Sequence, residues 1–124
     1  LIWYFRGLES AADLIEETPF EQRLISALCV MELIQGCKSR KELKEVTAFI
    51  RNTFMDVVHC EKVVSEKAIA LLRLHALSHG LRTVDALIAS TAIVCDAVLV
   101  TGNFRHFEMI KGLNVVKFEP PRPN

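Results

Sequence analysis

The fold of this chain is decided by residues 97–103, which read Ala-Val-Leu-Val-Thr-Gly-Asn. The first four are apolar, as expected of a short parallel strand that is covered on both faces. Thr101, Gly102 and Asn103 follow the strand at once. Ligands of open parallel sheets bind at the carboxyl ends of the strands. We therefore expect Asn103 to lie beside a binding crevice.

Helical patterns dominate on both sides of this strand. Ser39 with Glu42 three residues later is typical of a helix N-cap, and Gly36 and Gly80 stand where helices are expected to end. The pattern predicts helices over residues 8–17, 27–35, 39–52, 65–79 and 83–94, and strands over 22–26, 55–59, 97–100 and 114–118. Such alternation predicts an α/β protein, a three-layer α/β/α sandwich around a short parallel sheet.

The overall composition favours a single folded domain. Of the 124 residues 51% are hydrophobic, and 15 basic residues balance 15 acidic ones, so nucleic acid would need a local basic patch. The four cysteines form no Cys-x-x-Cys pair, and we expect them to be reduced core residues of a cytoplasmic protein. No apolar run approaches the ~18 residues of a membrane span. We assign residues 1–118 to the domain and 119–124 to an extended tail.

Carboxylates stand within two other apolar runs. Glu32 lies in residues 28–36 and Asp85 in residues 83–90. Burying a carboxylate among Leu, Ile and Val is costly unless a cation meets it. Oxygen ligands suit hard divalent ions such as Mg²⁺ and Mn²⁺. We expect Glu32, Asp85 and Asn103 to face one crevice and to hold such an ion together.

The segments that carry these residues resemble the acidic motifs of the PIN domain, most of all those of VapC-type toxins from prokaryotic toxin–antitoxin pairs. The resemblance covers nearly the whole chain. It implies a PIN-like fold and an endoribonuclease that uses Mg²⁺ or Mn²⁺ to activate water against an RNA phosphodiester. It also implies a cognate antitoxin as partner, a homodimer and a cytoplasmic location.

The resemblance assigns roles to residues by motif. Glu32 and Asp85 match acidic positions of the family, and Asn103 matches a position that carries Asp or Asn. These three residues are therefore the predicted catalytic and metal-binding residues. Ser26 and Thr101 match polar neighbours that would orient ligands or water.

Two departures from the family pattern stand out. His106 occupies a position where many relatives carry an acid, and its imidazole would contact a phosphate, transfer a proton or simply lie on the surface. Relatives also begin with a strand that ends in Asp, whereas residues 1–7 here match the helix that follows that strand, although a buried strand over residues 1–5 is the other interpretation. We expect the natural protein to be longer at its amino end.

Each predicted site residue also has a simpler interpretation. Glu32 would reach water or pair with Lys38, Asp85 would favour a helix N-terminus, and Asn103 would be a turn residue. Lys38, Arg40 and Arg82 would contact RNA phosphates or belong to a solvated face. The missing first acid and His106 also favour a rival interpretation, a catalytically impaired PIN-like domain that acts as a binding or scaffold protein.

Overall fold

The computed structural model describes residues 15–117. The chain divides into two compact units with the boundary between Val58 and His59. Residues 15–17 are helical, as predicted. The rest of the helix predicted for 8–17, the helix predicted for 1–7 and the tail 119–124 lie outside the described residues. No helix within 15–117 is both long and apolar enough to span a membrane.

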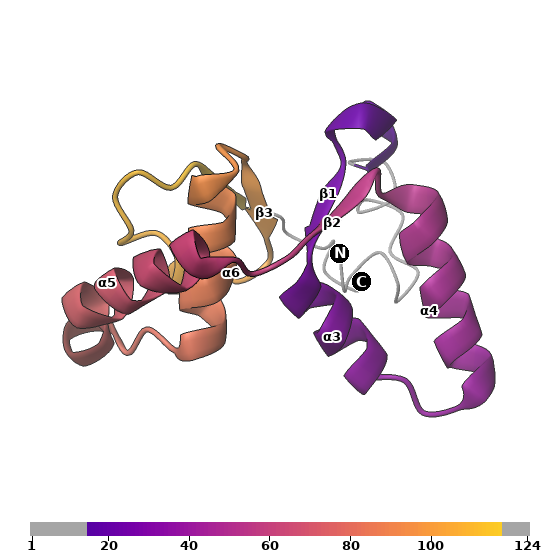
Figure 1. Ribbon diagram of the computed structural model, residues 1–124, viewed down its shortest axis with the longest axis horizontal. Coiled ribbons are helices and arrows are strands. Elements are labelled where there is room, and N and C mark those ends of the chain that lie inside the picture. The colour runs from indigo at the N-terminus through magenta and orange to yellow at the C-terminus, as the bar shows by residue number, and fades with distance from the viewer. Residues whose placement is uncertain (1–14, 118–124) are drawn as a thin grey trace, which may run out of the picture. The chain divides into compact units, whose positions relative to one another are not determined.

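The first unit joins two parallel strands to two helices. Its elements are the 3₁₀-helix η1 (Phe20–Gln22), β1 (Leu24–Ser26), α3 (Ala27–Gln35), α4 (Arg40–Thr53) and β2 (Asp56–Val58). β1 and β2 lie side by side, with Ile25 opposite Val57, and α3 continues directly from the end of β1 (Figure 1). The predicted strands and helices are therefore confirmed here, with shifts of at most two residues at their ends.

The core of this unit follows from the apolar stripes of its helices. The buried cluster consists of Ile25, Leu33, Val46, Ile50 and Phe54. The predicted N-cap of α4 is confirmed, because the Ser39 hydroxyl accepts the Glu42 N–H at 3.1 Å. Glu42 in turn accepts the Lys38 N–H through its carboxylate at 2.7 Å. Two N–H groups at the start of the helix thus gain partners within the chain.

The second unit repeats the same plan. Its elements are α5 (Lys62–His79), α6 (Thr83–Val94), β3 (Leu99–Thr101), the 3₁₀-helix η2 (Phe104–His106) and β4 (Val115–Lys117). β3 and β4 are parallel neighbours with Leu99 opposite Val115. Both of these side chains pack against the buried cluster that α5 and α6 supply. Successive side chains of a strand alternate between faces, so Val100 points away from that core and is 37% exposed. The expectation of a strand covered on both faces is wrong for Val100.

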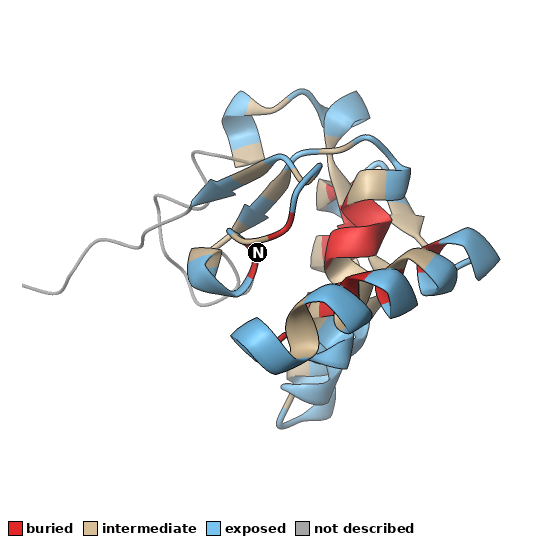
Figure 2. Ribbon diagram, turned by 90° about the vertical axis from the view of Figure 1, so that its left-hand side faces the viewer, coloured by how far each residue is buried: buried red, intermediate tan, exposed pale blue. Residues whose placement is uncertain are grey.

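Helix α6 is the most buried helix segment of this unit, as its nearly unbroken apolar sequence predicts. Ser90 is fully buried, and its hydroxyl donates to the Ala86 carbonyl at 2.6 Å. Thr91 donates to the Leu87 carbonyl in the same way at 2.7 Å. These bonds to the preceding turn satisfy the two hydroxyls, so both residues are tolerated inside. In Figure 2 the buried positions gather in short stretches, while loops and outer helix faces are exposed.

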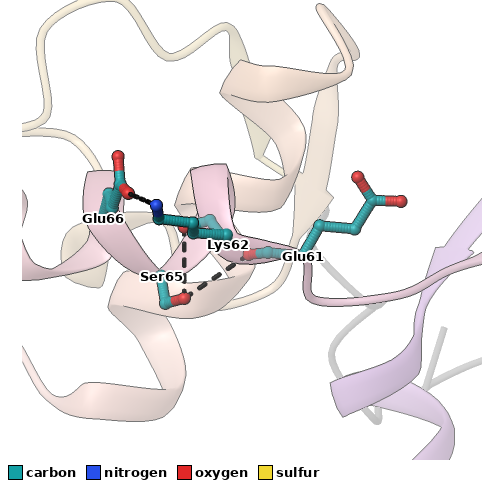
Figure 3. A network of polar contacts seen from close by, with 4 residues as sticks. All are labelled: Glu61, Lys62, Ser65 and Glu66. Atoms are coloured by element: carbon teal, nitrogen blue, oxygen red, sulfur yellow. Dashed lines mark hydrogen bonds and ion pairs between the residues drawn. The ribbon is translucent and has the colours of Figure 1, made fainter.

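The start of α5 differs from the sequence prediction. The helix begins at Lys62, three residues before the predicted start at Ser65. The Ser65 hydroxyl donates to the carbonyls of Glu61 and Lys62 at 3.4 and 3.3 Å, and Lys62 pairs with Glu66 at 3.7 Å (Figure 3). Glu61, the N-cap residue, makes no capping bond with its side chain. The extra turn therefore carries no cap signature in the sequence.

The cysteines are free, as predicted, but they are not all core residues. Cys60 and Cys95 are exposed, whereas Cys29 and Cys37 are partly buried. Cys60 lies in the link between β2 and α5, and Cys95 follows the last residue of α6. Both therefore stand at element ends that the helices do not cover, which the apolar character of their neighbours does not reveal.

Candidate active site

Glu32 lies in the second turn of α3, a helix whose start is fixed by Ser26. The Ser26 hydroxyl accepts the Cys29 N–H at 3.1 Å and so acts as the N-cap. Glu32 itself is exposed. Within residues 15–117 it makes no ion pair with Lys38, and the expectation of a buried carboxylate is wrong at this position. The apolar neighbours of Glu32 instead occupy other faces of α3, with Leu33 buried.

Cys29 lies on α3 three residues before Glu32, and its thiol is affected by that carboxylate. Burial raises the pKa of the Cys29 thiol, and the negative charge of Glu32 raises the pKa further, against the lowering effect of the hydrogen bond from Ser26. The carboxylate of Glu32 thus acts on a thiol in the preceding turn of α3. Cys29 remains a neutral thiol at neutral pH and is a packing residue.

In the second unit the structure brings Asp85 and His106 together. Asp85 lies in the first turn of α6, where a helix N-terminus favours negative charge. His106 is the last residue of η2, and its Nδ1 atom is 3.2 Å from Oδ2 of Asp85. The Asp85 side chain is 24% exposed and that of His106 58%. A partly buried carboxylate therefore has an imidazole as its immediate polar neighbour.

Asn103 is held by the end of β3. Its N–H donates to the Thr101 hydroxyl at 3.0 Å, and Asn103 is the residue before the first turn of η2. Its amide side chain is exposed and makes no capping bond. Thr101 thus orients the backbone of the predicted ligand. Whether it also orients water or a metal stays a prediction.

Sequence reasoning missed the residue that fixes this loop. Phe107 follows His106 and is 3% exposed. It belongs to the buried cluster that includes Ala86 and Ala89 of α6 and Ala68 and Leu71 of α5. Its ring therefore ties η2 to the helix that carries Asp85. The available signal was an aromatic residue directly after a polar motif residue.

The candidate phosphate-binding residues are all exposed. Arg82 is the N-cap residue of α6, three residues before Asp85, and its carbonyl accepts the Ala86 N–H at 2.9 Å. The predicted range 83–94 of this helix is confirmed. Lys38 and Arg40 stand at the start of α4 in the other unit. Their exposure is compatible with both predicted roles, RNA contact and solvated face.

A divalent metal site requires several oxygen or nitrogen ligands that converge on one point. Within residues 15–117 no group of three or more His, Cys, Asp or Glu side chains could hold an ion. Asp85 and His106 form a two-donor pair from separate elements, and the Asn103 amide oxygen lies on the same loop as His106. Carboxylate, imidazole and amide groups are all ligands of divalent ions. Within residues 15–117, however, the only contact between such side chains at this site is the one between Asp85 and His106, and the convergence of Glu32 with them stays a prediction.

The comparisons of this chain with known families, proteins and structures agree with one another. The model of the PIN domain family matches residues 1–112. Ribonuclease VapC19 of Mycobacterium tuberculosis is 36% identical over 113 residues, which cover 89% of this chain and 88% of that protein. A toxin–antitoxin complex from Klebsiella pneumoniae superimposes with a TM-score of 0.76 at 28% identity, covering 94% of this chain and 89% of that one.

A further solved structure supports the fold alone. VapBC-1 from nontypeable Haemophilus influenzae has a TM-score of 0.77 at 18% identity and covers 94% of this chain and 90% of that chain. The predicted α/β class and PIN-like fold are confirmed by these superpositions together with the parallel strand pairs.

Proposed function

This chain belongs to the PIN-domain family and is of the VapC type, and we propose that it is the toxin ribonuclease of a toxin–antitoxin pair. The observation that carries the proposal is the 36% identity to a VapC ribonuclease over 113 residues. Its substrate is RNA, cut at a phosphodiester, and its partner is a cognate antitoxin. We propose further that it is cytoplasmic and acts as a homodimer.

The residues proposed to hold the metal are Glu32, Asp85 and Asn103, with Mg²⁺ or Mn²⁺ as the ion. A bound divalent ion lowers the pKa of a coordinated water and offsets charge on the phosphate. Asp85 supplies a carboxylate that is shielded from bulk water on one side, which strengthens its attraction for a cation. Thr101 holds the backbone of Asn103, and Ser26 fixes the helix that presents Glu32.

Exposed basic residues complete the proposal. Arg82 stands three residues before Asp85 and carries a charge that would attract the RNA backbone to the site. Lys38 and Arg40, exposed at the start of α4, are proposed as further RNA contacts. Because the net charge of the chain is zero, such local contacts are the available source of electrostatic affinity.

The decisive experiment compares RNA cleavage by wild type and by Asp85→Asn, with and without EDTA. We expect chelation to stop cleavage and Asp85→Asn to reduce it at least about a hundredfold, since a charged ligand contributes several kcal/mol. Asp96→Asn is the matched control, because Asp96 is an exposed residue of the same unit with φ 52°, a conformation that Asn tolerates. It should cleave like wild type. Cleavage that survives both EDTA and Asp85→Asn would rule out the mechanism.

One observation favours a second candidate, a PIN-like domain that binds without cutting. His106, not an acid, contacts Asp85, and residues 15–117 hold no three-residue ligand cluster. This alternative predicts that neither Mg²⁺ nor Mn²⁺ binds at millimolar concentration. A calorimetric titration of both ions against the purified protein separates the two candidates without any activity measurement.

A further inference from the structure

Three exposed cations form a straight row along helix α4, outside the residues proposed to hold the metal. Arg40, Lys44 and Arg51 follow one another at intervals of four and seven residues, so they share one side of a helix with about 3.6 residues per turn. The polar residue Thr47 occupies the intervening turn on the same side, and all four residues are exposed. Because each residue adds about 1.5 Å along the axis, this α4 row is about 16 Å long.

The acidic residues of α4 do not neutralise the row. Glu42 and Glu45 lie about 100° or more around the helix axis from each of its three cations. The Glu42 carboxylate is also engaged in the helix cap, where it accepts the Lys38 N–H at 2.7 Å. Within residues 15–117 no cation of the row makes an ion pair. This side of α4 therefore keeps a local positive charge, although the net charge of the chain is zero.

The positions of these cations work against the stability of α4. Arg40 stands in the first turn, where the helix dipole favours negative charge. Arg40 and Lys44 are four residues apart, a spacing at which like charges on a helix repel each other. A polyanion that lies along α4 would relieve both conflicts at once. A merely solvated helix face gains nothing from this arrangement, whereas a binding surface for a polyanion does.

We propose that Arg40, Lys44 and Arg51 form a binding surface for the sugar–phosphate backbone of RNA, in addition to the residues proposed to cut it. This inference rests on the proposed function, which names RNA as the substrate. A straight row of cations suits a backbone that carries one charge at every nucleotide. The arginines at both ends of the row can bind phosphate oxygens through two parallel N–H bonds each. Phosphate contacts carry no sequence information, so the row adds affinity for RNA of any sequence.

The test measures RNA binding in the absence of cleavage. The probe is a labelled polyuridylate of about 20 nucleotides, longer than most single-strand binding sites, and its fluorescence anisotropy is followed in EDTA at several KCl concentrations. The row variant combines Arg40→Gln, Lys44→Gln and Arg51→Gln, because glutamine has a high helix propensity. The matched control removes three exposed cations from the second unit through Lys62→Gln, Arg73→Gln and Lys111→Gln.

We expect the row variant to bind polyuridylate at least about tenfold more weakly than wild type at about 0.1 M KCl. The slope of log affinity against log KCl concentration should fall by about 2, since each lost cation removes about 0.7 on a single strand. The control variant should change both quantities far less. The row variant should also unfold at an equal or higher urea concentration than wild type, because repulsion within α4 is removed.

Three results would overturn this inference alone. The first is unchanged binding in the row variant, or equal losses in the row and control variants. The second is tighter binding of poly-L-glutamate than of polyuridylate, lost in the row variant, which would assign the row to an acidic protein segment. The third is a wild type that cleaves RNA with Mn²⁺ but does not bind polyuridylate. A wild type that neither binds nor cleaves RNA would overturn the proposed function as well.

Discussion

Two glycines end helices within residues 15–117, and the structure predicts opposite consequences for replacing them with alanine. Gly80 ends α5 with φ 68° and ψ 25°, and its N–H donates to the Ala76 carbonyl at 3.0 Å. Gly36 ends α3 with φ −77° and ψ −8°, an ordinary right-handed conformation. An added Cβ would meet nothing within 4 Å at Gly80, and only ordinary contacts of 3.5 and 3.6 Å at Gly36. The difference between the sites is therefore backbone strain alone.

The magnitudes follow from two terms. An L-residue in the left-handed conformation costs about 1–2 kcal/mol. Replacing glycine by alanine stabilises by about 0.4–1 kcal/mol through the reduced entropy of the unfolded chain. Gly80→Ala is thus expected to lower the free energy of unfolding by about 1 kcal/mol, whereas Gly36→Ala leaves it unchanged or raises it slightly. Urea unfolding followed by circular dichroism measures both variants under one condition.

Gly80→Asn is the matched control, because asparagine tolerates the left-handed region better than alanine does. It should recover part of the loss seen in Gly80→Ala. Equal shifts for Gly80→Ala and Gly36→Ala, or a Gly80→Ala variant more stable than wild type, would refute the reasoning. Either result would mean that α5 does not end in the left-handed conformation in solution.

Three further predictions concern side chains of known environment. Ser26→Ala should lower Tm by about 3–6 °C because it removes the cap of α3, whereas Ser26→Thr should keep most of the wild-type stability. Equal Tm values for wild type and both variants would contradict the capping role. Burial raises the pKa of the Cys29 thiol, whereas Cys60 is exposed to reagents in solution. Iodoacetamide at pH 9 should therefore label Cys60 before Cys29, as measured by mass spectrometry. Faster labelling of Cys29 would contradict this. Val46→Ala, at a fully buried position, should lower the free energy of unfolding by about 2 kcal/mol, as measured by urea unfolding. Val63→Ala, at a position that is 50% exposed, should lower it far less. Similar losses in the two variants would show that Val46 is not in the core.

The helices and strands were largely predictable because their signals are local. The pair Ser39 and Glu42 correctly predicted the start of α4, and Gly36 and Gly80 correctly predicted the ends of α3 and α5. The first turn of α5 was missed because Glu61 provides no side-chain cap. The two glycines look alike in sequence although only one has a positive φ, since the conformation depends on how the following segment leaves the helix.

The candidate site was predictable in its residue types but not in its contacts. The motifs drew attention to Asp85, Asn103 and His106, yet nothing in the sequence placed a ring nitrogen of His106 beside Asp85. That contact joins residues 21 positions apart and depends on the turn of η2 (Phe104–His106). Burial was also misjudged for Glu32, because apolar sequence neighbours occupy other faces of a helix.

The burial of Phe107 explains why a loop of exposed residues can still hold donors in fixed positions. Asn103 and His106 are exposed and lie on a single 3₁₀ turn, which alone would offer little rigidity. Phe107 places its ring in the cluster shared by α5 and α6, so the turn is anchored one residue after His106. Thr101 anchors it from the other side through the Asn103 N–H. Core packing and the strand end together therefore set the distance between His106 and Asp85.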